Sequence, residues 1–200
     1  MSDIDAMPVP DSALARVAAD LVRTSAPEVL FNHCQRAYQF GSMLGRKLGW
    51  QVDREILYIS TALHDLGLTD RFDGQRGFEV EGAAAAESFL LAQGCPEVRV
   101  AVVKDAIALH LDTTRLASDP RPEVVLTAMG SGMDTHGLRV DHVHPGFIDT
   151  VLESWPRLGF RAWLRATCFA QAQRKPDSPI AWWVNSGRMH EDIGAPRFTE

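Results

Sequence analysis

The stretch YISTALHDLG, residues 58–67, decides the fold, because an apolar helical run ends there in a histidine and an aspartate. Apolar residues recur before it at spacings of three and four, which predicts a helix that is capped by Asp53 and ends around His64. The buried side of this helix leads directly to His64 and Asp65. Charged side chains are almost never left buried without a partner, so a buried aspartate beside a buried histidine indicates a bound cation.

Two more side chains of these types lie on, or at the end of, the inward sides of other predicted helices. The apolar stripe from about Glu28 to Leu48 contains His33, and a helix that begins at Pro122 leads to Asp134. Imidazole nitrogens and carboxylate oxygens suit divalent metals, and two of each leave positions open for water. We therefore predict one divalent metal, with zinc first and iron, manganese, cobalt or nickel as alternatives. Its predicted ligands are His33, His64, Asp65 and Asp134.

The rest of the sequence predicts further helices and no strand, so the expected fold is an all-α, single-domain helical bundle. Residues 1–10 are expected to form a flexible N-terminal arm, and 11–175 the helical domain, whose first helix is capped by Asp11. In the C-terminal segment 176–200, Trp182 and Trp183 are expected to pack on this domain or across a homodimer interface. The remaining predicted helices are 11–26, 80–93, 96–110, 145–155 and 158–173, and the predicted loops include 67–77 and 111–121.

The composition excludes several classes of protein. The chain has 200 residues, 46% of them hydrophobic and 23% charged, which is typical of one globular domain. The net charge is −6 and the basic residues are scattered, so we expect a small-molecule substrate and not a nucleic acid. No apolar run approaches the ~20 residues of a membrane-spanning helix, and the first residues lack the pattern of a signal peptide. The expected location is the cytoplasm.

Four other polar residues are candidates for the pocket. His110 ends the helix predicted at 96–110 and can transfer a proton near neutral pH, and Glu79 offers a carboxylate, so both are predicted to be catalytic beside Asp65. Arg36 lies one turn after His33 on the same helix face, and it is a candidate for substrate binding together with Lys104. Packing for His110, and surface placement for Glu79 and Arg36, remain the alternatives. For Lys104, the alternative is a position next to the metal ligands without contact with substrate.

The order His33, His64-Asp65 and Asp134 resembles the H…HD…D signature of the HD superfamily of metal-dependent phosphohydrolases. The stretches FNHCQRAYQFG, TALHDLGLTDRF, RGFEVEGAAAAESFL and EVRVAVVKDAIALHLDTT resemble the cyanamide-hydratase-like branch of that superfamily. This likeness covers roughly residues 32–139 and implies a five-helix core with the four ligands named above. Two-metal members place additional histidines between the His-Asp pair and the last aspartate, where this sequence has only His110. One metal is therefore favoured.

The leading hypothesis is a hydrolase or hydratase in which metal-bound water attacks a small polar substrate. A divalent metal lowers the pKa of bound water from ~15.7 toward ~7, which supplies hydroxide at neutral pH. Cyanamide-like nitriles as substrates are implied by the resemblance alone. A nucleotide or phosphoester phosphohydrolase is the second hypothesis, and a non-catalytic metal-containing binding protein is the third. The second needs cations for the phosphate, and the candidates are Arg36, Arg71, Arg76 and Lys104.

Overall fold

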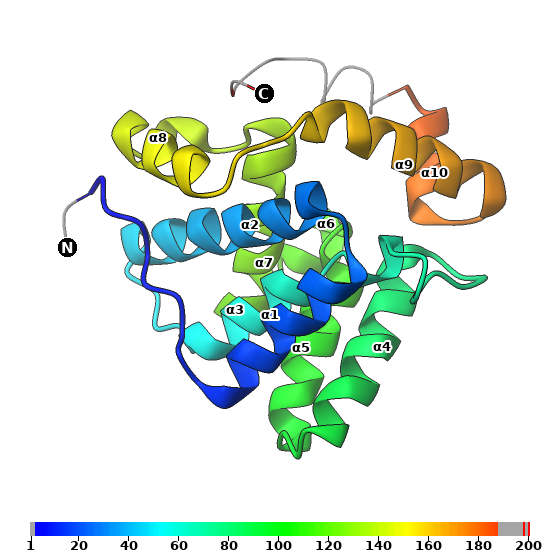
Figure 1. Ribbon diagram of the computed structural model, residues 1–200, viewed down its shortest axis with the longest axis horizontal. Coiled ribbons are helices and arrows are strands. Elements are labelled where there is room, and N and C mark those ends of the chain that lie inside the picture. The colour runs from blue at the N-terminus through cyan, green and yellow to red at the C-terminus, as the bar shows by residue number, and fades with distance from the viewer. Residues whose placement is uncertain (1–2, 188–197, 199) are drawn as a thin grey trace.

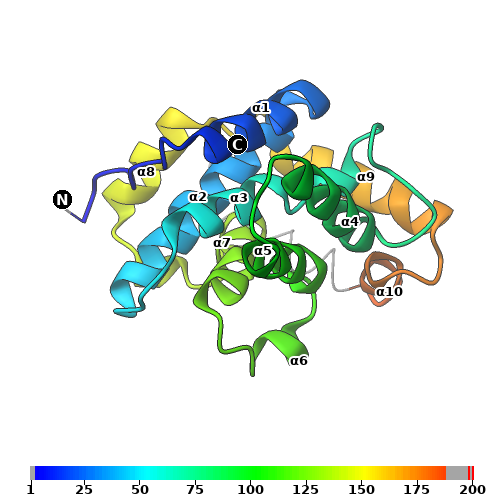
Figure 2. The ribbon, with the colours of Figure 1, turned by 90° about the horizontal axis from the view of Figure 1, so that it is seen from below.

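A computed structural model describes residues 3–187, Phe198 and Glu200 of the chain. Over these residues the fold is all-helical and contains no strand, as the sequence predicts (Figures 1 and 2). None of the described helices is long and apolar enough to cross a membrane. The α-helices are α1 (Ala13–Ser25), α2 (Glu28–Lys47), α3 (Arg54–Leu63), α4 (Phe78–Ala92), α5 (Glu97–Leu109), α6 (Thr113–Leu116), α7 (Pro122–His136), α8 (Pro145–Ser154), α9 (Phe160–Arg174) and α10 (Pro179–Asn185).

The centre of the bundle is the crossing of α2 and α7, which lie against each other in both views (Figures 1 and 2). Two glycines allow the helix backbones to approach closely there. A Cβ atom added to Gly130 would lie 2.1 Å from the carbonyl oxygen of Ala37, and one added to Gly41 would lie 2.7 Å from that of Leu126. This close approach brings His33 of α2 and Asp134 of α7 into contact, although they are far apart in the sequence.

The helix that carries the His-Asp pair is fixed at both ends. At its start, the carboxylate of Asp53 accepts hydrogen bonds from the backbone N–H groups of Glu55 and Ile56, as expected of an N-cap. After its end, the chain makes the 3-10 turn Leu66–Leu68, which lies against α4. A Cβ added to Gly67 would lie 2.0 Å from the carbonyl oxygen of Phe78, so this turn contacts the start of α4 directly.

Three local predictions need correction. The hydroxyl of Ser12, and not the carboxylate of Asp11, accepts from the N–H of Ala15 and caps α1. The loop predicted at 111–121 contains α6, whose four residues are too few to show an apolar period. The aperiodic segment after Lys175 contains α10, which begins after a capping Ser178 with Pro179 in the first turn. A serine followed by proline is a helix-start signal that the search for a period missed.

The two ends of the described chain pack on the bundle. In the predicted N-terminal arm, the backbone N–H of Met7 donates to the side chain of Gln39 at 2.6 Å, and Tyr38 donates to the carbonyl oxygen of Pro8. The end of this arm is therefore bonded to α2. The flexibility expected of residues 1–10 stays a prediction. In the predicted C-terminal segment, α10 packs on α9. Residues 188–197 and 199 of that segment lie outside the described residues, and its contact with a second subunit stays a prediction.

Candidate metal centre

Three of the four predicted ligands converge on one point in the bundle interior. The Nε2 atoms of His33 and His64 are 3.1 Å apart, and they lie 3.4 Å and 3.3 Å respectively from Oδ2 of Asp65. All three side chains are buried, and together they are the described group whose donor atoms are close enough to hold a metal ion. His33 comes from α2, while His64 and Asp65 directly follow the last residue of α3, so the site depends on the packing of these two helices.

Helix geometry fixes which nitrogen of His64 faces the cluster. His64 is the C-cap of α3, and its Nδ1 donates to the carbonyl oxygen of Thr61 at 2.7 Å, one of the carbonyls that a helix end leaves unpaired. In the neutral ring the Nε2 lone pair therefore points at His33 and Asp65. Burial lowers the pKa of His64 to about 4, so the ring is neutral at pH 7.

The donor set fits a cation, because hydrogen-bond acceptors face one another at this point. Nδ1 of His33 is bonded to the carboxylate of Asp134, so its Nε2 also presents a lone pair when the ring is neutral. Two lone pairs and the charged oxygen of Asp65 repel one another unless a proton or a metal ion lies among them. Burial by itself lowers the pKa of His33, but Asp134 and Asp65 raise it overall, so a proton and a metal compete for this place.

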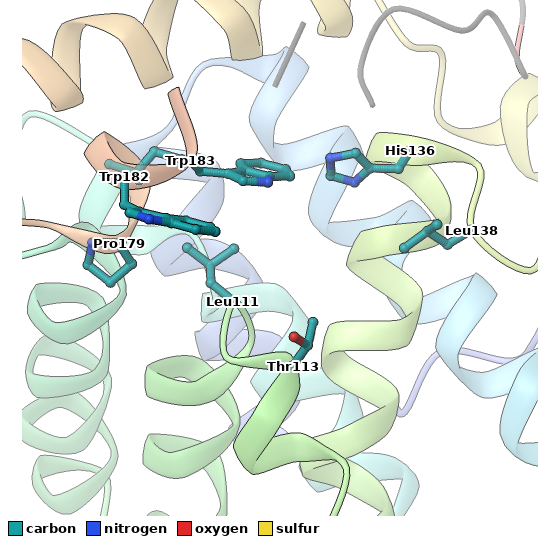
Figure 3. Close-up of a pocket in the computed structure, with 8 residues that line it drawn as sticks. Leu111, Thr113, His136, Leu138, Pro179, Trp182 and Trp183 are labelled. Atoms are coloured by element: carbon teal, nitrogen blue, oxygen red, sulfur yellow. The ribbon is translucent and has the colours of Figure 1, made fainter. Parts of the chain in front are cut away.

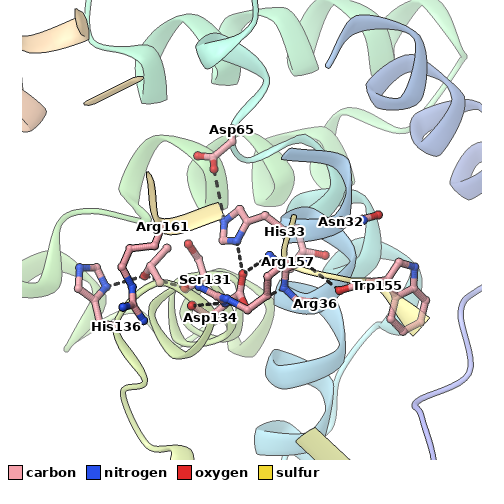
Figure 4. Close-up of polar contacts among 12 residues, drawn as sticks. Asn32, His33, Arg36, Asp65, Ser131, Asp134, His136, Trp155, Arg157 and Arg161 are labelled. Atoms are coloured by element: carbon pink, nitrogen blue, oxygen red, sulfur yellow. Dashed lines mark hydrogen bonds and ion pairs between the residues drawn. The ribbon is translucent and has the colours of Figure 1, made fainter. Parts of the chain in front are cut away.

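Asp134, the fourth predicted ligand, lies on the other side of the His33 ring. Its Oδ2 is 2.6 Å from Nδ1 of His33, and its carboxylate also accepts hydrogen bonds from Arg36 and Arg157 (Figure 4). Burial by itself raises the pKa of Asp134, but Arg36 and His33 lower it below its ordinary range, so the group stays ionised. The structure brings Asp134 to His33 without bringing its oxygens into the group formed by His33, His64 and Asp65.

The two residues that are predicted to be catalytic in addition to Asp65 are both buried. His110 is the C-cap of α5, where its Nδ1 donates to the carbonyl oxygen of Ile107 at 2.6 Å, and its Nε2 lies 3.7 Å from Oδ1 of Asp65. Its ring meets that of His64 edge-on at 5.1 Å between centroids. Glu79 lies in the first turn of α4, and among the described residues its buried Oε2 has no hydrogen-bond partner. The structure therefore places His110 at the cluster, whereas no contact of Glu79 with the cluster is seen among the described side chains.

The two residues predicted to bind substrate are engaged elsewhere. Arg36 is fully buried, and besides Asp134 it donates to the carbonyl oxygens of Trp155 and Pro156. Lys104 lies on the outer side of α5, where its ammonium group pairs with Glu87 of α4 at 2.7 Å. Neither cation faces the metal-binding group, so their predicted role in substrate binding receives no support from their positions.

Sequence reasoning missed two side chains that contact the site. Arg157, in the connection between α8 and α9, is buried and donates to both the carboxylate and the carbonyl oxygen of Asp134. Phe160, the first residue of α9, stacks on the ring of His33 with 4.4 Å between centroids. Both lie in the stretch WPRLGF, which has neither a metal-ligand pattern nor an apolar period, so no signal in the sequence marks them.

A pocket of about 570 Å³ opens between the ends of α5 and α7 and the face of α10 (Figure 3). Trp182 and Trp183 form one side of it, and His136 and Leu138 form the other. Leu111, which also lines the pocket, directly follows His110 in the sequence, while His136 comes two residues after Asp134. The pocket is mainly apolar and lies where the chain leaves two of the helices that carry site residues.

Comparison with known proteins agrees with this geometry. The HD domain matches residues 30–136, which is more than half of the chain and includes every residue of the buried cluster. Two proteins of Saccharomyces cerevisiae, Cyanamide hydratase DDI2 and Cyanamide hydratase DDI3, are each 26% identical to this chain over 192 residues. The match covers 94% of this chain and 82% of each yeast protein. The resemblance seen in the sequence is thereby confirmed, and the chain belongs to the HD domain family.

Proposed function

We propose that the protein is a metal-dependent hydratase or hydrolase that adds water to a small polar substrate, with nitriles of the cyanamide type as the first candidates. The observation that carries this proposal is the convergence of three buried acceptor atoms from His33, His64 and Asp65. The near full-length likeness to two cyanamide hydratases supports the choice of nitriles.

The metal we propose is zinc, held by the two imidazoles and the carboxylate. Catalytic zinc sites commonly have three protein ligands of these kinds and keep one position open. A metal bound there would acidify water and so supply a nucleophile at neutral pH. Because His64 is neutral at pH 7 and already directed at the cluster, it needs no proton loss or rotation to bind.

His110 is the group we propose for proton transfer. Nitrile hydration adds the oxygen of water to carbon and a proton to nitrogen, so one group must hold and deliver that proton. The bond from Nδ1 to the carbonyl of Ile107 leaves Nε2 of His110 as its free ring position, beside Asp65. Glu79 remains a proposed second acid or base, since its buried Oε2 has no partner among the described residues.

The positions of the cations disfavour the phosphohydrolase alternative. A phosphate ester needs positive groups at the reacting centre. Arg36 is bonded to Asp134, Arg76 to Glu81 and Lys104 to Glu87. The cations named for that alternative are thus held elsewhere in the described structure, except Arg71, which lies over the ring of Phe72.

The test is metal analysis together with a substrate panel. The panel contains cyanamide, alkyl and aryl nitriles that suit the apolar pocket, nucleotides and simple phosphoesters. We expect one metal per chain and turnover of at least one nitrile. His64→Ala should lose both metal and turnover while helical content persists, and the control His142→Ala, at an exposed histidine, should lose neither. Full metal occupancy in His64→Ala would refute the site, and turnover of phosphoesters alone would refute the substrate class.

A further inference from the structure

The carboxylate of Asp134 has no lone pair left for a metal. Oδ1 accepts from Nε of Arg36 and from Nη1 of Arg157, both at 2.8 Å. Oδ2 accepts from Nη2 of Arg36 at 2.9 Å and from Nδ1 of His33 at 2.6 Å. An ionised carboxylate offers about four acceptor sites, so these four hydrogen bonds fill it. The side chain is also fully buried.

Asp134 and the metal-binding group use opposite nitrogens of His33. Nδ1 is bonded to Asp134, while Nε2 faces Asp65 on the other side of the ring (Figure 4). Nε2 also lies 3.1 Å from Nε2 of His64. A metal-ligating histidine commonly donates its other ring N–H to a carboxylate, which fixes the tautomer and the orientation of the ring. The arrangement around His33 has this form, with Asp134 as the outer partner.

The surroundings of Asp134 hold it rigidly on that side. Arg36 donates from Nη1 to the carbonyl oxygens of Trp155 and Pro156, and Arg157 donates from Nε to Glu200 at 3.0 Å. The two positive charges of Arg36 and Arg157 are therefore balanced by the negative charges of Asp134 and Glu200. The Phe160 ring stacks on His33 and lies under both guanidinium groups.

We propose that Asp134 is a positioning residue for His33, and that Arg36 and Arg157 hold its carboxylate in the orientation that bonds Nδ1 of His33. The metal of the proposed function, on which this inference rests, is then bound by His33, His64 and Asp65 without a second aspartate. This differs from the four-ligand set that the sequence predicts. The arginines serve to hold Asp134, so they are unavailable to substrate.

Metal affinity distinguishes a ligand role of Asp134 from a positioning role, because the two roles predict opposite effects of weakening the arginines. If Asp134 were a ligand, Arg36 and Arg157 would compete with the metal for its oxygens, and weakening them would tighten metal binding. If Asp134 positions His33, weakening them should loosen metal binding about 10- to 100-fold. The variants are Arg36→Lys and Arg157→Lys, measured by competition with a chelator. Arg161→Lys is the control, because Arg161 contacts Glu200 but is not bonded to Asp134.

Two spectroscopic measurements on Asp134→Asn complete the test. The visible spectrum of the cobalt(II)-loaded protein reports the directly bound groups, and it should match the parent protein in Asp134→Asn but change in Asp65→Asn. The proton on Nδ1 of His33, followed by nitrogen-15 NMR in the metal-free protein, should shift in Asp134→Asn. A changed cobalt spectrum in Asp134→Asn, or tighter metal binding in either arginine variant, would overturn the proposal.

Failure of the proposed function gives a different pattern of results. If the parent protein binds no metal, the proposed function fails, while the NMR comparison still shows whether Asp134 holds the Nδ1 proton of His33. If the parent binds metal and hydrates nitriles but Asp134→Asn loses metal as completely as His64→Ala, the function stands and the positioning role is wrong. Should Asp134→Asn not fold, the two arginine variants decide alone.

Discussion

At the scale of single residues, His110 is the group whose role is most directly testable. Its proton is fixed on Nδ1 by the carbonyl of Ile107, and its Nε2 is 3.7 Å from Asp65 without belonging to the group that converges for a metal. A positioned acid or base contributes about 100- to 10,000-fold to a rate. We expect His110→Ala to lower turnover by a factor in this range while metal content per chain stays that of the parent, measured by elemental analysis.

Glu79→Gln tests the second proposed acid or base in the same way. Among the described residues, the buried Oε2 of Glu79 has no hydrogen-bond partner. The substitution nearly conserves the size of the side chain, so the protein should stay about as stable as the parent. Turnover should fall if Glu79 is the second acid or base. Loss of metal from His110→Ala in proportion to activity would instead make His110 a ligand, and unchanged turnover in Glu79→Gln would assign Glu79 to packing.

At the scale of helices, the site depends on how closely α2 and α7 approach. Gly130→Ala would place a Cβ atom 2.1 Å from the carbonyl oxygen of Ala37, and a helix backbone cannot yield there as a side chain can. We expect the free energy of unfolding to fall by about 1–3 kcal/mol, since overpacking outweighs the gain of about 1 kcal/mol in helix propensity. Urea denaturation followed by circular dichroism measures the change.

Gly132→Ala is the matched control on the same helix. The nearest atom that its Cβ atom would meet is the end of the Leu138 side chain, at 3.3 Å, which can rotate away. The substitution should therefore leave stability unchanged or raise it by up to about 1 kcal/mol through helix propensity. If both alanine variants were equally stable, close backbone contact between α2 and α7 would not be what holds the crossing together.

Most of the helices and the three residues of the metal-binding group could be predicted because local patterns encode them. His33 lies in an apolar stripe, and His64 and Asp65 end another, so periodicity alone places them inside. The partners of Asp134 could not be predicted in this way. Arg36 lies 98 residues before it in the chain and Arg157 lies in an aperiodic connection, so only the folded packing brings them to one carboxylate. An aspartate in a sequence suggests a metal ligand, but the residues around it in the fold decide whether its oxygens are available to a metal.

At the scale of the whole molecule, α9 and α10 are joined to the bundle by contacts at both ends of α9. At its start, Phe160 stacks on His33, and the preceding connection carries Arg157 to Asp134. At its end, Asp73 of the loop before α4 bonds to residues of the last turn of α9 and to the lysine after it. The loop that follows the His-Asp pair thus also anchors the last helices of the described chain.

This second anchor makes stability depend on acid in a defined range. Burial by itself raises the pKa of Asp73, but hydrogen bonds from Lys175, Arg174 and Gln171 lower it from 3.8 to about 2. Because the folded-state pKa lies below the unfolded one, the contribution to stability is fully present above pH 3.8 and is lost as the pH falls toward 2. Asp73→Asn should therefore be less stable than the parent at pH 7, and the difference should shrink between pH 4 and pH 2. Thermal unfolding at intervals across this pH range measures the difference in stability between the parent and Asp73→Asn.

The control is Asp70→Asn, at an exposed aspartate of the same loop. A difference between parent and Asp73→Asn that stays constant down to pH 2 would show that the ion pairs of Asp73 do not hold α9 to the bundle.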